Sequence, residues 1–157
     1  MSAQGVVAGP ALDDDAGTPP VVEIEGLVKD YPGPVRVLGG VDLVVRRVEL
    51  AAIVGPSGSG KSTLLHILGT LDRPTSGTVR VAGRDVGSLP EAELAAFRAH
   101  EIGFVFQQFF LLEGLSAVEN VANALLYRGI APRRRIAAAT DALVRLGLAH
   151  RLHQSPS

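Results

Sequence analysis

The sequence predicts an α/β domain, and three adjacent stretches carry this prediction. Residues 50–54 are an uninterrupted apolar run, which is typical of a parallel strand covered on both faces. Residues 55–63, with the sequence GPSGSGKST, are a glycine-rich turn. Residues 63–68 are apolar at helical spacing. Because a strand and a helix flank the glycine-rich turn, the turn is a candidate site rather than a chance pattern.

The turn fits the pattern G-x-x-x-x-G-K-[ST] of a phosphate-binding loop. Its glycines can adopt positive φ and let backbone N–H groups converge on an anion at the start of the helix. Lys61 offers a positive charge to the terminal phosphates, and Ser62 offers a hydroxyl to Mg²⁺. The alternative, a surface turn with one solvated lysine, does not account for the flanking strand and helix. The residues predicted to bind nucleotide here are Gly55, Pro56, Ser57, Gly58, Ser59, Gly60, Lys61, Ser62 and Thr63.

Composition excludes several functional classes. The 157 residues, 46% of them hydrophobic, suit a single domain with its own core. A formal net charge of −1 gives no electrostatic case for binding nucleic acid or an anionic membrane. The absence of cysteine excludes disulfides and thiolate metal sites and is compatible with the cytoplasm. No apolar run reaches the length of a membrane span, and residues 1–20 lack the pattern of a signal peptide.

The segment before the loop predicts a tail and a small sheet. Residues 1–20 are rich in Ala, Gly and Pro and have no apolar periodicity, so we expect a disordered tail, with the domain covering residues 21–157. Residues 21–31 indicate a strand followed by a turn at 32–34. Apolar and polar residues alternate over 41–46, which predicts a strand with one buried face. These strands favour a mainly antiparallel subdomain ahead of the nucleotide core.

Turns and strands alternate with helices after the loop helix. The pattern predicts a strand at 78–81 between turns, and a second buried strand at 102–106 that ends at Gln107. Two capping boxes, Ser88 with Glu91 and Ser116 with Glu119, predict helices that run to about residues 100 and 127. A last helix is expected from about Pro132, with Gly147 as its C-cap. Its apolar face is predicted to contain Ile136, Ala139, Leu143 and Leu146.

Together these motifs resemble the ATP-binding subunits of ABC transporters, and most of all the branch that serves lipoprotein release and macrolide export. The resemblance rests on Tyr31, on the phosphate loop, on LLHILGTLDRPTSGTV at 64–79, and on IGFVFQQF and LSAVENV after residue 101. It covers residues 21 to 157. It implies a P-loop NTPase core with an N-terminal antiparallel β subdomain and the start of a helical subdomain.

The resemblance also implies roles for two residues outside the loop. Tyr31 matches the aromatic residue that stacks on adenine, where the residues alone favour a half-buried strand tyrosine. Gln107 matches the glutamine that reaches Mg²⁺ and the attacking water, where the residues alone favour a solvated loop position. The implied catalytic residues are Lys61 and Gln107, the implied Mg²⁺ ligands are Ser62 and Gln107, and the implied ligands of the protein are ATP and Mg²⁺.

Family resemblance further implies partners and a location. The family's ATP-binding subunits form head-to-tail dimers on a membrane permease, at the cytoplasmic face of the membrane. The apolar run at 109–112 is either core of the next subdomain or a patch that receives the permease. No nucleic acid partner is implied.

Two departures from the family pattern lower the expected activity. Residues 108–157 contain no signature segment, no apolar strand ending in Asp-Glu and no switch histidine. We therefore expect an incomplete domain, truncated before the signature, that binds nucleotide weakly and hydrolyses it negligibly. Val48 also stands where the family usually has glycine, so the turn there is either rebuilt or strained, because a β-branched residue tolerates positive φ poorly.

Other interpretations of the sequence remain open. A P-loop small-molecule kinase would need an arginine lid, for which residues 133–135 are the candidates, although a solvated helix start accounts for them more simply. A fragment that docks on a permease without chemistry is a further alternative. Asp72 follows an apolar run but lies too close to Lys61 for an adjacent strand, so we interpret it as a turn residue.

Overall fold

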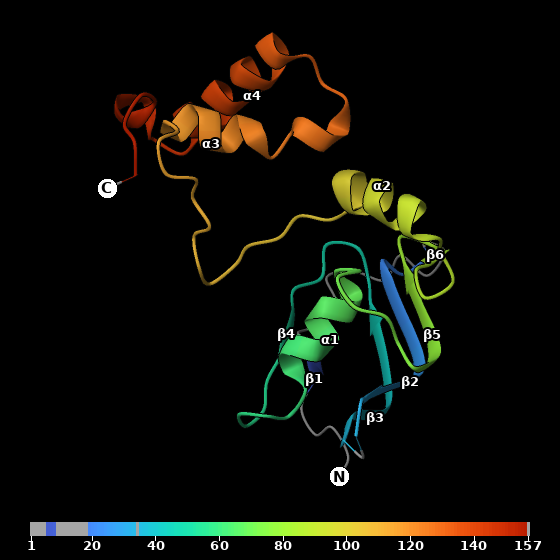
Figure 1. Ribbon diagram of the computed structural model, residues 1–157. Helices are drawn as coiled ribbons and strands as arrows, with labels where there is room; N and C mark the ends of the chain where they lie inside the picture. Colours follow the sequence, from blue (N-terminus) through green and yellow to red (C-terminus); the bar gives the residue numbers. More distant parts are fainter. Residues whose placement is uncertain (1–5, 9–18, 34, 157) are drawn as a thin grey trace. The chain divides into compact units, whose positions relative to one another are not determined.

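A computed structural model describes residues 6–8, 19–33 and 35–156 of the chain (Figure 1). The chain divides into two compact units, Met1–Leu94 and Ala95–Ser157, each of which is described on its own.

The first unit contains an antiparallel sheet with the strand order β3-β2-β5-β6. Its strands are β2 (Val22–Tyr31), β3 (Val35–Val45), β5 (Ser76–Val81) and β6 (Arg84–Asp85). Alternation produces the predicted one-sided burial of β3, since Val41 and Leu43 are buried while Asp42 and Val44 are exposed. The strands predicted at residues 21–31, 41–46 and 78–81, and the α/β fold class, are confirmed.

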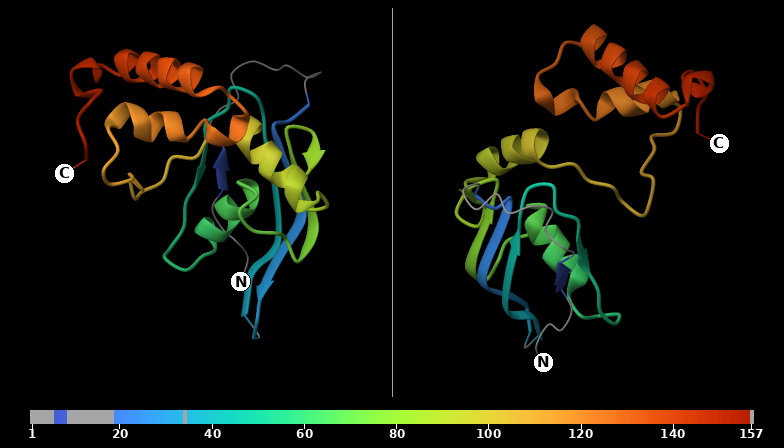
Figure 2. Two further views of the ribbon diagram at one scale, coloured as in Figure 1. Left: turned by 45° about the horizontal axis from the view of Figure 1, so that its top comes forward. Right: turned by 180° about the vertical axis from the view of Figure 1, so that it is seen from behind.

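The loop helix covers this sheet. Helix α1 (Lys61–Leu68) contacts β3 and lies beside it in the views of Figure 1 and Figure 2. Its apolar stripe buries Leu64 and Ile67, as the helical spacing predicts. The sheet residues buried in the same unit are Ile24 and Leu27 of β2, Leu38, Val41 and Leu43 of β3, and Val79 and Val81 of β5.

The strand before the loop differs from the sequence prediction. β4 (Ala51–Ile53) pairs antiparallel with β1 (Val6–Ala8), with Val6 opposite Ile53. The prediction of a doubly covered parallel strand is wrong, because the pairing is antiparallel and Ala52 in the middle of β4 is exposed. A parallel ladder needs a neighbour reached by a crossover. After α1 the described chain returns instead to β2 as the antiparallel strand β5.

β1 lies within the segment that the sequence predicts to be disordered. Its three residues supply backbone partners for β4, whose N–H and C=O groups need partners in a ladder. Residues 1–5 and 9–18 of the predicted tail lie outside the described residues, and Pro19 and Pro20 have no regular secondary structure.

The second unit is helical. It contains the end of α2 (Glu91–Glu101), then α3 (Ala117–Asn123), η1 (Leu126–Arg128), α4 (Pro132–Arg145) and η2 (Ala149–Arg151). α3 and α4 pack together and bury four small or branched side chains, those of Val118, Ala122, Ala139 and Leu143.

Local capping signals place these helices. Both bonds of the predicted box at Ser116 and Glu119 are present at the start of α3. The C-cap of α4 is Leu146, and Gly147, which the sequence predicts as the C-cap, is the next residue, with φ of 76°. Leu146 was predicted to lie on the buried face but is exposed, because the helix ends one residue before it. α2 begins at Glu91, and the hydroxyl of Ser88 donates to the carbonyl of Asp85.

Residues 102–106 do not form the predicted buried strand. They have no regular secondary structure, and the side chains of Phe104, Val105 and Phe106 are exposed. Apolar composition makes a strand only where a second strand offers a ladder, and no strand in the described part of the second unit does so. The rings of Phe104 and Phe106 instead stack with centroids 5.3 Å apart. No described helix is both long and apolar enough to cross a bilayer.

Candidate functional site

The predicted phosphate loop lies between β4 and α1 and has the backbone that its glycines allow. Gly58 has φ of 78° and Gly60 has φ of 88°, both in the left-handed region that glycine adopts without steric cost. Gly55, with φ of 159°, is nearly extended. The chain therefore turns through residues 56–60 before Lys61 begins the helix.

Gly60 is required by space as well as by φ. A Cβ atom at this position would lie 2.7 Å from Leu38 Cδ2 and 3.0 Å from the Val37 carbonyl oxygen. The end of the loop thus rests directly on β3. No larger residue fits between the sheet and the first turn of the helix.

The start of α1 has no side-chain cap. Gly60 is its N-cap and, having no side chain, accepts no hydrogen bond from the first amides of the helix. The first amides of an α-helix have no carbonyl partner within the helix, and they present a partial positive charge. Ser62 is exposed and Thr63 half-buried in this first turn.

Lys61 folds back over the loop. Its ammonium donates to the carbonyl oxygens of Gly55 at 2.9 Å and Pro56 at 2.7 Å, and lies 3.4 Å from Ser59 Oγ. These contacts hold a positive charge at the loop, next to the open amides of α1. An ammonium group and unpaired amides around one turn are the groups that bind polyphosphate.

Tyr31 lies at the end of β2 and is 38% exposed. Its hydroxyl donates to Asp72 Oδ2 at 2.7 Å. The ammonium of Lys29 lies 4.8 Å from the ring centroid and donates to Asp72 Oδ1 at 2.6 Å. Asp72 lies in the bend after α1, as a turn residue would, but the sequence analysis gave it no role.

Burial and hydrogen bonding act in opposite directions on Asp72. Partial burial alone would raise the pKa of its carboxyl group, but hydrogen bonds from Lys29, Tyr31 and the Arg73 amide outweigh this effect and lower it. One signal in the sequence points to this cluster. Lys29 and Tyr31 are two residues apart in a strand and so share a face of the sheet.

The remaining predicted residues lie in the second unit. Gln107 is exposed in a bend that follows the irregular segment 102–106. Arg133 and Arg134 are exposed in the first turn of α4, which is the solvated helix start of the simpler interpretation.

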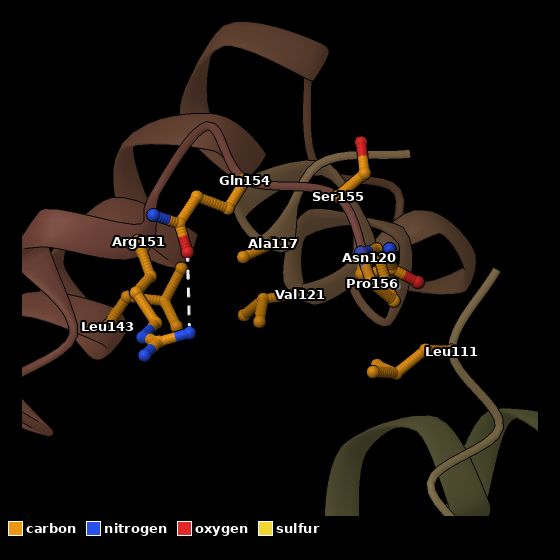
Figure 3. Close-up of a pocket in the computed structure, with 9 residues that line it drawn as sticks. All are labelled: Leu111, Ala117, Asn120, Val121, Leu143, Arg151, Gln154, Ser155 and Pro156. Carbon is orange, nitrogen blue, oxygen red and sulfur yellow. Dashed lines mark hydrogen bonds between the residues drawn. The ribbon is translucent and has the colours of Figure 1, made fainter. Parts of the chain in front are cut away.

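The second unit also contains a cavity of about 320 Å³ (Figure 3). Leu111, Val121 and Leu143 form part of its apolar lining, and Arg151 Nη1 lies 3.4 Å from Gln154 Oε1 at its edge. None of the predicted site residues lines it.

Comparison with known proteins gives three concordant results. The pattern of the family described as "ABC transporter" matches residues 38–157. The lipoprotein-releasing system ATP-binding protein LolD of Geobacter metallireducens is 51% identical over 139 residues, which cover 87% of this chain and 62% of LolD. The macrolide export ATP-binding/permease protein MacB of Nitrosomonas europaea is 48% identical over 143 residues, covering 88% of this chain and 22% of MacB.

Solved structures similar to this chain agree with the sequence comparisons. The ATP-binding cassette MJ0796, in a dimeric post-hydrolysis state bound to ADP and Pi, superposes with a TM-score of 0.73 at 35% identity, covering 86% of this chain and 61% of that one. The fold of CbiO1 from Clostridium perfringens is also similar, with a TM-score of 0.76 at 24% identity over 88% of this chain and 55% of that one. This chain therefore spans about three-fifths of LolD and about a fifth of MacB. None of these comparisons supports a small-molecule kinase.

Proposed function

Because this chain belongs to the ATP-binding subunits of the ABC transporter family, we propose that residues 55–63 bind the phosphates of ATP. In the whole protein, hydrolysis of that ATP would drive export through a membrane permease. The observation that carries the proposal is the combination, in one loop, of an uncapped helix start, two glycines with positive φ and the Lys61 ammonium.

The loop residues fit a polyphosphate for a physical reason. Backbone amides bind phosphate oxygens without carrying a full charge, so Lys61 is the one charged group of the loop that must lose water when a phosphate binds. Lys61 donates to loop carbonyls in the described structure, so a phosphate would compete for the same ammonium hydrogens. Charged hydrogen bonds of this kind are worth about 1.5–3 kcal/mol each.

Magnesium would be held by Ser62, and the Mg²⁺ role that the family resemblance implies for Gln107 of the second unit stays a prediction. The Ser62 hydroxyl is exposed in the first turn of α1, which suits a metal that takes few protein ligands and several phosphate and water oxygens. When bound, Mg²⁺ neutralises charge on the phosphates. The described residues contain no group of three or more acidic, histidine or cysteine side chains that could hold a metal by themselves.

The exposed ring of Tyr31 would stack on adenine. Stacking of a base on an aromatic ring contributes about 1–3 kcal/mol. Lys29 lies over one face of the ring, so adenine would stack on the other face.

The permease would bind through the second unit. Phe109 is 87% exposed, and Phe110 and Leu111 beside it are exposed too, which favours an interaction patch over a core segment. Such a patch would place the subunit at the cytoplasmic face of the membrane, with a second ATP-binding subunit beside it. The MJ0796 cassette is dimeric.

The first test of this function measures ATP binding to the chain Met1–Ser157 by calorimetry. Replacement of Lys61 by Ala should weaken binding by about tenfold or more, because at least one charged hydrogen bond is lost. Arg47→Ala, which also removes one positive charge from an exposed position, is the control and should leave affinity unchanged. Equal affinities of the wild type and Lys61→Ala would refute phosphate binding by the loop.

Turnover by the same chain should be negligible. Residues 108–157 contain no Asp-Glu strand end and no switch histidine, so the second Mg²⁺ ligand and the general base are not supplied. Phosphate release would be measured with ATP and Mg²⁺ in excess, with Lys61→Ala as the background. A rate comparable to that of a complete LolD subunit would contradict this proposal.

A further inference from the structure

Asp72 links the loop helix to the strand that carries Tyr31. It accepts hydrogen bonds from Lys29 Nζ at 2.6 Å and from its neighbour's amide, Arg73 N–H, at 2.7 Å, both on Oδ1. Its other oxygen accepts the Tyr31 hydroxyl at 2.7 Å. Each carboxylate oxygen therefore accepts a hydrogen bond from one β2 side chain, Oδ1 from Lys29 and Oδ2 from Tyr31.

Lys29 makes this carboxylate necessary. The lysine is only 9% exposed, and a buried ammonium group is costly unless it is paired. Asp72 and the Arg73 carbonyl oxygen, 2.8 Å from Lys29 Nζ, supply the pairing. The ammonium is thereby held 4.8 Å from the centre of the Tyr31 ring.

The Tyr31 ring is constrained in two ways. Its hydroxyl is tied to Asp72, and Lys29 lies over the ring. Tyr31 nevertheless stays 38% exposed, so part of the residue is accessible to a ligand. A ring held in this manner loses little rotational freedom when a base stacks on it.

The hairpin of β2 and β3 contacts the chain at the start of α1 and again just after the end of α1. Gly60 at its start packs against Val37 and Leu38 of β3. Asp72 beyond its end bonds Lys29 and Tyr31 of β2. Since β2 and β3 pair along their length, with Tyr31 opposite Val35, the phosphate loop and the Tyr31 ring share one rigid support.

We propose that Asp72 is a positioning residue for the base of the nucleotide. Through the Tyr31 hydroxyl and Lys29 it fixes the ring as a one-sided stacking surface, so that the chain binds ATP more tightly than a triphosphate without a base. This inference rests on the proposed function of the loop and adds a residue to it.

The test compares ATP with inorganic tripolyphosphate, which offers the same phosphates and no base. Affinities would be measured by calorimetry on the full chain for the wild type and four variants, which are Tyr31→Ala, Tyr31→Phe, Asp72→Asn and the double variant with both Tyr31→Phe and Asp72→Asn. Asp30→Asn is the matched control, because it removes an acidic partner of Arg36 at 2.9 Å next to Tyr31 in β2.

The expected pattern separates the base from the phosphates. Tyr31→Ala should weaken ATP binding by about fivefold or more, the loss of one stacked base. Tyr31→Phe and Asp72→Asn should each weaken it by about two- to fivefold, and the double variant by no more than the larger single effect, because the two residues act through one hydrogen bond. Tripolyphosphate affinity should stay within about twofold in every variant, and Asp30→Asn should match the wild type for both ligands.

Other results overturn the inference in distinguishable ways. If the wild type binds neither ligand, the proposed function fails and the inference fails with it. If Tyr31→Ala loses ATP affinity while Tyr31→Phe and Asp72→Asn retain it, the function stands and the positioning role is refuted. Equal losses for ATP and tripolyphosphate in Asp72→Asn would make Asp72 a general structural residue. Should circular dichroism show Asp72→Asn unfolded, Tyr31→Phe decides, since it leaves the Lys29–Asp72 ion pair intact.

Discussion

Lys29 and Lys61 show how placement decides what the same side chain does. Lys61 donates to the carbonyl groups of its own loop, at a helix start without a side-chain cap. Lys29 is buried against a carboxylate and lies beside an aromatic ring. The first arrangement suits ligand binding and the second suits support of a neighbouring side chain, because only the second charge is already neutralised.

The ion pair of Asp72 predicts a pH dependence of stability. Its pKa in the folded chain lies below the ordinary value of 3.8, so it adds stability above that value and loses it as pH falls through the folded pKa. The free energy of unfolding, measured by urea denaturation, should therefore decrease below about pH 4.

Asp72→Asn should remove part of this decrease. Asp30 and Glu119 also have lowered pKa values, the first through its bond with Arg36 and the second through its bonds with Ser116, so they titrate in the same range. The comparison is accordingly between variants, with Asp30→Asn as the reference. An identical pH profile for Asp72→Asn and the wild type would contradict the prediction.

At the scale of elements, the turn between β3 and β4 carries backbone strain. The Glu49 amide donates to the Arg46 carbonyl at 3.3 Å, and the Glu49 carboxylate accepts the Arg46 amide at 2.7 Å. Val48, third in this turn, has φ of 62°, where a type II turn favours glycine. Of the two sequence expectations, a rebuilt turn or a strained one, the structure shows the strained turn.

Val48→Gly should stabilise the chain by about 1 kcal/mol. Strain at a non-glycine left-handed residue costs about 1–3 kcal/mol, and the greater freedom of glycine in the unfolded chain offsets part of the gain. The Val48 side chain is 88% exposed, so little packing is lost.

Val44→Gly is the control, for which the opposite change in stability is expected. Val44 is also an exposed valine, but it lies in β3 and has no positive φ, so its replacement should destabilise. Urea denaturation measures both changes. A destabilised Val48→Gly would show that the turn stores no strain.

On the scale of the whole molecule, each unit has its own core. The first centres on β2, β3, β5 and α1, and the second on α3 and α4. In the second unit, residues 102–112 have no regular secondary structure and expose several aromatic side chains. Segments of this kind open at low free energy and are cut first by proteases.

Limited proteolysis with chymotrypsin should therefore cut first among Phe104, Phe106, Phe109 and Phe110. Phe97, buried in α2, is the internal control and should be cut much more slowly. Mass spectrometry of the first products identifies the site. Cleavage at Phe97 at a comparable rate would show that the exposed segment is protected.

The sequence by itself determined the features that depend on a few neighbouring residues. The glycines and Lys61 of the loop, the box at Ser116 and Glu119, and the alternation in β3 each act over at most one or two turns of chain. The family followed from the same local motifs. Such signals are legible because their physical causes, φ preference, capping and periodicity, are local.

Only the tertiary structure decided which distant groups meet. The apolar run at 50–54 found an antiparallel partner in β1, and the run at 102–106 found none among the described strands. Asp72 became a partner of Tyr31, 41 residues away. A strand ladder or a buried ion pair needs a partner from a distant part of the chain. A short stretch of sequence does not show which partner the fold brings there.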